Sequence, residues 1–360
     1  MKNHSRKTYS KINLPALVNN YITIKNLAPE SETIAVVKAN AYGHGAIEVA
    51  NYLSQHVSVL AVAFIDEAIE LRKAGITLPI LILEGPLSIE DYRLSLEQNF
   101  WLIIHNAEQI EWLTSLTNKN TGNLWLKIDT GMNRLGIKPN DVDKIIKNFN
   151  QEQLKNLVLC THFSSAEQLD NPKTKRQIQQ FDLVNKNYNL PKSLANSAGI
   201  INWPTSHGDF NRLGLSLYGA TPIPRNNLSI SLTPVMTLLS TVIALRKLQI
   251  NESVGYGEKW QAKRPSVIAT IAIGYADGYP RNAKNGTPVF IKGQIAPLAG
   301  RVSMDMITID ITDIDNVIIG DTVELWGNNL PVETVAEYCD TNNYELLTRV
   351  TNRVPRKYIT

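Results

Sequence analysis

Residues 34–45 read IAVVKANAYGHG. An apolar run rich in β-branched residues ends abruptly at Lys38, and two glycines, Gly43 and Gly45, follow it. Such a run predicts a strand of a parallel sheet, because those strands are buried on both faces. Burial at the end of a strand disfavours the charged form of a lysine and lowers its pKa, as formation of a Schiff base requires. We therefore expect this strand to begin the fold and Lys38 to carry chemistry.

Strand-like and helix-like segments alternate from about residue 33 to residue 217. The predicted strands are 34–38, 59–64, 78–83, 101–105, 124–128, 157–161, 193–196 and 213–217, with helices at 66–74 and 107–116. Eight strand–helix units over roughly 200 residues predict a (β/α)8 TIM barrel. The alternative is a doubly wound open sheet, although no Gly-x-Gly-x-x-Gly follows the first strand to support it.

The pattern changes after about Pro222, where strands separated by Gly, Pro and Asn or Asp turns predict a mostly-β domain. Its predicted strands are 232–245, 266–273, 288–291, 306–311 and 322–326, and its one evident helix is 332–338. We expect residues 9–222 to form the barrel and 223–360 the second domain. The strand-like segment 8–13 is a candidate to pair with that second domain.

Composition argues against several classes of partner. The chain has 360 residues, a net charge of +3 and no basic block, so nucleic acid is not an expected partner. It has no apolar run of the ~20 residues that span a membrane and no secretory signal before Pro15. Two cysteines form no disulfide framework, and His44 has no second ligand at metal-binding spacing. We expect a cytoplasmic protein without a metal.

Polar residues cluster at the predicted carboxyl ends of the strands, where TIM barrels have their active sites. Alone, each is typical of a solvated loop, but together they would form a ring around one mouth of the barrel. They are Lys38, Tyr42, Lys127, Asp129, Arg134, His162, Asn196 and Ser197, together with Arg212, which precedes the eighth predicted strand, and Gly214 just inside it.

The strings around these residues resemble those of alanine racemases, which use pyridoxal 5′-phosphate. Segment 37–45 resembles the motif of the cofactor lysine, and KIDTGMNRLG at 127–136 resembles the motif of the fifth strand. The resemblance covers nearly the whole chain and continues at 161–163, 196–198, 211–214, 254–257, 273–279, 300–305 and 353–356.

The resemblance implies a role for each matching residue. Lys38 would hold the cofactor covalently, and Lys38 and Tyr256 would be the two catalytic bases. Lys127 would be the lysine that is often carbamylated. The implied cofactor contacts are Tyr42, His162, Asn196, Ser197, Arg212, Gly214, Leu215 and Asn352. The implied substrate contacts are Arg134, Met304, Asp305 and Tyr275.

The implied reaction interconverts L- and D-alanine, supplying D-alanine for peptidoglycan, by proton exchange on opposite faces of a planar intermediate. Tyr256 would come from a second subunit, so the resemblance implies a homodimer with shared active sites. Arg212 cannot accept a proton and would leave the pyridine nitrogen neutral, which suits proton exchange over transamination. His162 would lie between Arg212 and Tyr256, and a positive neighbour would lower the tyrosine pKa.

One departure from the family leaves the substrate open. Asn352 stands where several members have tyrosine, so a roomier pocket and a broader alanine/serine racemase are an alternative. A related barrel decarboxylase would require a catalytic cysteine in the second domain, whereas Cys339 is in a helix-like stretch. A non-catalytic pyridoxal-phosphate carrier would resemble the barrel alone and lack the domain of Tyr256.

Overall fold

Eight parallel strands form the sheet of the first domain in the computed structural model, which describes residues 6–115, 123–223 and 230–360. Their order is β8-β7-β6-β5-β4-β3-β2-β9. The strands are β2 (Glu32–Val36), β3 (Leu60–Val62), β4 (Ile80–Ile82), β5 (Trp101–Ile104), β6 (Leu124–Lys127), β7 (Val158–Cys160), β8 (Lys192–Ser193) and β9 (Phe210–Leu213).

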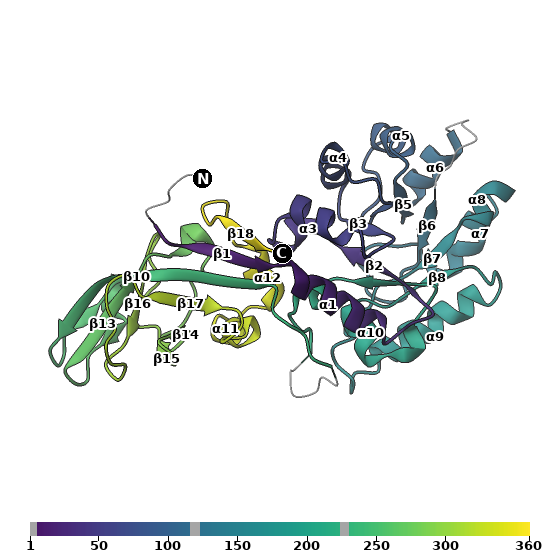
Figure 1. Cartoon of the computed structure of the whole chain (residues 1–360). Helices are drawn as coiled ribbons and strands as arrows, with labels where there is room; N and C mark the ends of the chain where they lie inside the picture. Colours follow the sequence, from purple (N-terminus) through teal and green to yellow (C-terminus); the bar gives the residue numbers. More distant parts are fainter. Residues whose placement is uncertain (1–5, 116–122, 224–229) are drawn as a thin grey trace.

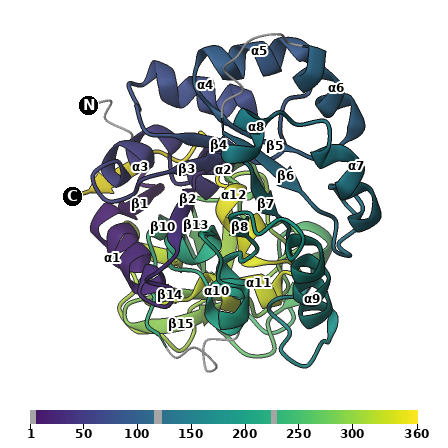
Figure 2. The same cartoon turned by 90° about the vertical axis from the view of Figure 1, so that its right-hand side faces the viewer.

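The two edges of this sheet meet, so the sheet is nearly closed as a barrel. The amide of Arg212 in β9 donates to the carbonyl of Ala195, just beyond β8, at 2.9 Å. Strands β3, β4 and β7 are buried along their whole length, as covered parallel strands are. Figure 2 shows the helices arranged around the strands. The predicted TIM barrel is confirmed.

Apart from α1, which precedes β2, the helices of this half follow barrel strands in the sequence. They are α1 (Leu14–Lys25), α2 (Lys38–Tyr42), α3 (Ala46–Leu53), α4 (Ile65–Lys73), α5 (Ile89–Glu97), α6 (Ala107–Ser115), α7 (Val142–Ile146), α8 (Gln151–Lys155), α9 (Lys173–Asn185) and α10 (Ser197–Asn202). The predicted helix 107–116 ends outside the described residues.

A second sheet forms the mostly-β half that the sequence predicts. Its strands run in the order β15-β14-β17-β10-β1-β18, and β13 pairs with β10 and β16. The elements are β1 (Tyr9–Asn13), β10 (Met236–Leu248), β11 (Ser253–Val254), β12 (Trp260–Gln261), β13 (Ser266–Ile271), β14 (Pro288–Ile291), β15 (Gln294–Pro297), β16 (Ile307–Asp310), β17 (Thr322–Trp326), α11 (Val332–Tyr338), α12 (Asn343–Thr348) and β18 (Arg356–Ile359).

The first and the last strand of the described chain lie in this second sheet. Strand β1 pairs antiparallel with β10 and parallel with β18, so the described chain passes through the second sheet before it enters the barrel. Figure 1 shows β1 and β10 side by side, leading from the sheet toward the barrel. In the described part of the chain, no helix combines the length and the apolar character that crossing a membrane requires.

Some elements differ from those that the sequence predicts. The eighth strand is Phe210–Leu213, and the apolar run that follows forms a 3₁₀ turn, Leu215–Tyr218. Arg212 is thus inside the strand and Gly214 just beyond it. The first strand ends at Val36, two residues before Lys38. Helix α12 was not predicted, because six residues give too little periodicity to identify a helix.

Candidate active site

A cavity of about 580 Å³ lies at the carboxyl ends of the barrel strands. Its walls come from residues at the ends of β2, β6, β7, β8 and β9, and from α12 of the second domain. Ten of the sequence-predicted site residues line it: Lys38, Tyr42, Lys127, Arg134, His162, Asn196, Ser197, Arg212, Gly214 and Leu215.

A group of neutral donors lies on one side of the cavity. The amide of Gly214 donates to Oγ of Ser197 at 3.0 Å. A Cβ at position 214 would lie 2.7 Å from the Tyr42 hydroxyl, so a larger residue would fill this space. Burial raises the pKa of Tyr42, which keeps its hydroxyl protonated, and that hydroxyl has no hydrogen-bond partner among the described residues. These groups suit an anionic group with several oxygen acceptors.

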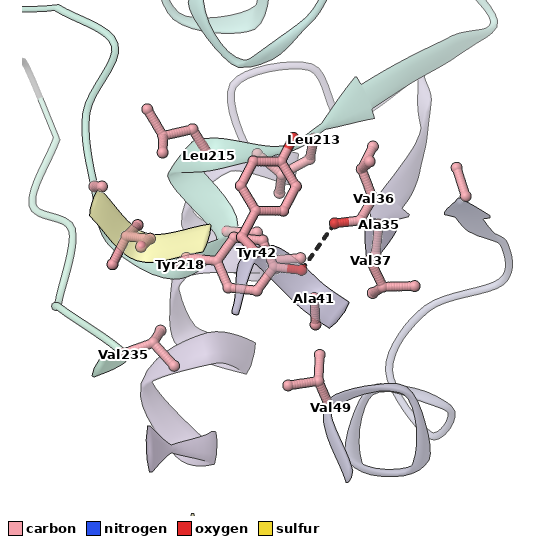
Figure 3. Close-up of a cluster of buried hydrophobic side chains, with 14 of the residues drawn as sticks. Ala35, Val36, Val37, Ala41, Tyr42, Val49, Leu213, Leu215, Tyr218 and Val235 are labelled. Atoms are coloured by element: carbon pink, nitrogen blue, oxygen red, sulfur yellow. Dashed lines mark hydrogen bonds between the residues drawn. The ribbon is translucent and has the colours of Figure 1, made fainter. Parts of the chain in front are cut away.

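Aromatic packing fixes the Tyr42 ring. It stacks on Tyr218 with ring centroids 4.8 Å apart, and the Tyr218 hydroxyl donates to the carbonyl of Val36 at 2.8 Å. Figure 3 shows the two rings together, with Leu213 and Leu215 of the neighbouring segment close by. The 3₁₀ turn Leu215–Tyr218 was not predicted from the sequence. Through Tyr218 it links the Tyr42 ring to the end of β2.

Arg212 forms a buried cationic wall of the cavity. Its guanidinium donates to the carbonyls of Thr161 at 2.6 Å, Ser193 at 2.9 Å and Leu194 at 3.1 Å. Its Nη2 also lies 3.4 Å from Nδ1 of His162. Burial and the charge of Arg212 hold the pKa of His162 well below its usual range, so this imidazole is neutral. Three carbonyl acceptors, from the ends of the two strands β7 and β8, fix the guanidinium in one place.

Lys127 is a buried amine that has no hydrogen bond to Nζ among the described residues. Burial lowers its pKa, and the charges of Arg212 and Arg134 act in the same direction. A larger fraction of Lys127 is therefore the neutral amine at a given pH than for an exposed lysine.

The loop after β6 brings Arg134 to the cavity. The Asp129 carboxylate accepts hydrogen bonds from the amides of Gly131 at 3.0 Å and Asn133 at 2.9 Å, and from Nζ of Lys138 at 2.5 Å. These contacts fold the loop back on itself. Arg134, unlike Arg212, is exposed and free to meet a ligand.

Sequence reasoning missed the wall that the second domain contributes. It consists of Asn342, Tyr344, Glu345 and Thr348, at or just before α12, and the cavity also contacts Glu84 and Cys160. The ring of Tyr344 lies 6.1 Å from that of Tyr42. A signal was present, because Asn342 caps α12 and Glu345 follows three residues later, the spacing of a capping box.

Family models identify the chain. The model for the alanine racemase N-terminal domain matches residues 12–222, and the model for the C-terminal domain matches residues 235–358. The chain belongs to the alanine racemase family. A match to both domain models of the racemase family removes the decarboxylase and the barrel-only carrier as alternatives.

Individual racemases are similar over their full length. The alanine racemase of Alteromonas mediterranea is 46% identical over 99% of this chain and 100% of its own. The structure of the biosynthetic alanine racemase from Pseudomonas aeruginosa has a TM-score of 0.94 at 41% identity, covering 99% of this chain and 100% of that one. The racemase of Bartonella henselae, described with covalently bound pyridoxal phosphate, has a TM-score of 0.89 at 32% identity, covering 98% and 99%.

The remaining residues predicted for racemase chemistry lie outside the cavity of this chain, on loops of the second domain. They are Tyr256, Tyr275, Met304, Asp305 and Asn352. Tyr256 is 71% exposed and Met304 54% exposed. Asn352 is also exposed and does not line the cavity of its own chain. A single chain therefore gives no support to the predicted roomier pocket at this residue.

Hydrogen bonds hold these second-domain loops together. The amide of Tyr275 donates to the carbonyl of Ser303 at 3.0 Å, and Arg353 donates to the Asp305 carboxylate at 2.8 Å. Arg6 donates to both carboxylate oxygens of Asp277, at 2.8 and 3.0 Å. Arg6, at the start of the described chain, thus stabilises the loop that contains Tyr275.

Proposed function

We propose that this chain interconverts L- and D-alanine with pyridoxal 5′-phosphate as its cofactor. The observation that carries the proposal is that a lysine, a group of neutral donors and a buried arginine converge on one cavity. The residues fit the cofactor, because the Tyr42 hydroxyl lacks a partner among the residues that the structure describes and only glycine leaves space at position 214. When bound, the cofactor withdraws electrons from the substrate Cα and so acidifies its proton.

Each group of residues that lines the cavity has a proposed role. The amine of Lys38 would hold the cofactor covalently. Tyr42, Ser197 and the Gly214 amide would bind its phosphate, the helix-capping Asn196 would order that segment, and Leu215 would pack beside it. Arg212, backed by neutral His162, would face the ring nitrogen and leave it without a proton. Arg134 would pair with the substrate carboxylate.

We further propose that two copies of the chain assemble and that Tyr256 acts in the partner's cavity. Large apolar side chains gather on the exposed second-domain loops, where Tyr256 is 71%, Met304 54% and Met306 43% exposed. Exposed apolar groups of this kind mark interaction surfaces. Lys38 would then exchange a proton at one face of Cα, and Tyr256 of the partner subunit at the other.

The direct test is an amino-acid panel. Protein with added cofactor is incubated with single L-amino acids, alanine and serine among them, and the D-isomers are separated by chiral chromatography. We expect the highest kcat/KM for alanine, with conversion in both directions. Release of CO2 without a D-isomer, or no racemisation of any substrate, would refute the proposed reaction.

Lys127 gives a second prediction, which is that its side chain carries a carbamate. A neutral amine adds to CO2 and releases one proton, and burial favours the neutral amine by lowering the pKa of Lys127. Protein equilibrated with ¹³C-bicarbonate should show one carbamate carbon by NMR, stronger as the pH rises. The signal should vanish in Lys127→Ala and persist in Lys147→Ala, which alters an exposed lysine. A signal retained in Lys127→Ala would assign the carbamate elsewhere.

A further inference from the structure

The segment that follows Lys38 has an unfavourable backbone conformation. Ala39, Asn40, Ala41 and Tyr42 all have φ between 51° and 54°. The left-handed region brings Cβ too close to the following carbonyl, so non-glycine residues adopt it singly rather than in runs. Four such residues in succession persist only when the surrounding structure holds them. The contacts that do so act on the backbone directly attached to Lys38.

The far end of this left-handed turn is held by buried groups. Nδ1 of His44 lies 3.0 Å from the carbonyl of Ala41 and 2.9 Å from that of Tyr42. Burial lowers the pKa of His44 to about 4, so the ring is neutral, and its Nδ1–H is the donor to these two carbonyls. Nε of Arg356 donates to the carbonyl of Gly43 at 2.7 Å. These contacts hold the carbonyls of Ala41, Tyr42 and Gly43 at the end of the turn. They do not hold the amide of Ala39 at its start.

Glu67 of α4 supplies that group. One of its carboxylate oxygens accepts the amide of Ala39 at 2.6 Å. The other accepts the amides of Ala63 at 2.8 Å and Phe64 at 3.3 Å, at the start of α4. The Ala39 amide belongs to the peptide that begins at the Lys38 carbonyl. Among the described residues no other side chain hydrogen-bonds this amide, so one carboxylate ties the lysine peptide to the neighbouring βα connection.

We propose that Glu67 is a positioning residue for Lys38, holding the first peptide of the left-handed turn so that the lysine amine points into the cavity. The inference rests on the proposed role of Lys38 as the cofactor lysine. Glu67 does not line the cavity, so it acts through the Ala39 peptide and not on the ligand. Without it, the start of the turn would relax toward ordinary right-handed or extended backbone and redirect the lysine side chain.

The test compares Glu67→Gln with Glu70→Gln, a matched change on the exposed face of the same helix. Glutamine keeps the length of the side chain but has one acceptor oxygen, so it cannot serve both the Ala39 amide and the amides at the start of α4. Amide hydrogen exchange in residues 37–46 and in α4 shows which of these two sets of hydrogen bonds is lost. Equilibrium dialysis with pyridoxal 5′-phosphate gives the cofactor Kd, and borohydride reduction with peptide mapping gives the fraction fixed on Lys38.

We expect Glu67→Gln to speed exchange in residues 39–43 and to weaken cofactor binding by about tenfold or more, the usual effect of losing a hydrogen bond to a charged group. The fraction fixed on Lys38 should fall, and kcat should fall more than KM rises. Glu70→Gln should behave like wild type. Glu67→Ala, which removes both contacts, should lower the cofactor affinity at least as much.

Two results would overturn the inference. Equal cofactor affinity in Glu67→Ala and Glu70→Gln would do so. So would a loss in Glu67→Ala that is confined to α4 exchange and thermal stability, since Glu67 would then act only as a helix cap. Failure of the premise looks different, because wild-type protein would then show no borohydride adduct on Lys38. An adduct on wild-type Lys38 with no effect of Glu67→Ala on cofactor binding rejects only the positioning role.

Discussion

Replacing Tyr256 with phenylalanine is expected to lower racemisation of alanine by about 10²–10⁴-fold, the usual contribution of a general acid–base group. Phenylalanine keeps the ring but removes the only proton that the side chain can exchange. Tyr256 is not among the residues proposed to hold the cofactor, so cofactor binding should be unchanged. The measurement is kcat for L- and D-alanine, beside the cofactor Kd from dialysis.

Tyr338→Phe is the control, since Tyr338 is also a surface tyrosine of the second domain, 42% exposed. It should retain wild-type rates. With α-deuterated substrates, the Tyr256 variant should show an isotope effect that differs between the two enantiomers, because only one face of Cα has lost its base. Near-normal turnover in both directions would exclude Tyr256 as a base.

The largest loss is expected for Lys38→Ala, which removes both a base and the covalent attachment of the cofactor. We expect activity to fall by at least ~10⁴-fold, the upper end for a single acid–base group. Borohydride reduction should fix the cofactor to Lys38 in wild-type protein and in Lys73→Ala, which alters an exposed lysine. No adduct should form in Lys38→Ala.

Peptide mapping makes the Lys38 prediction specific. Lys127 is the competing amine, because it lines the same cavity and burial lowers its pKa. An adduct that maps to Lys127 in wild-type protein, or an adduct that survives in Lys38→Ala, would show that Lys38 is not the cofactor lysine.

Much of the barrel was predictable because parallel strands buried on both faces are continuous apolar runs. The same property explains the error at the eighth strand. Residues 213–217 are apolar whether they form a strand or the buried 3₁₀ turn Leu215–Tyr218, and periodicity does not separate the two in so short a run. Gly214 marks the change, because its φ and ψ of −104° fit neither element.

The positions of Lys127, His162 and Asn196 were predictable from strand ends, whereas the turn after Lys38 was not. The glycines Gly43 and Gly45 indicate a loop, but nothing local requires left-handed backbone at Ala39. The side chain that bonds the Ala39 amide is Glu67, which is 28 residues away in the sequence. Strand ends likewise predict which residues share a mouth of the barrel, but not that the loop of Tyr256 stays outside it.

The central claim is that one active site combines Lys38 of one copy with Tyr256 of another, and mixed dimers test it most directly. Lys38→Ala and Tyr256→Phe chains with different tags are co-expressed, and the heterodimers are purified by both tags in turn. Each heterodimer should contain one intact site and one doubly altered site, and so regain about half of wild-type activity, as two-fold symmetry requires. Heterodimers no more active than the two parent variants would contradict a shared site.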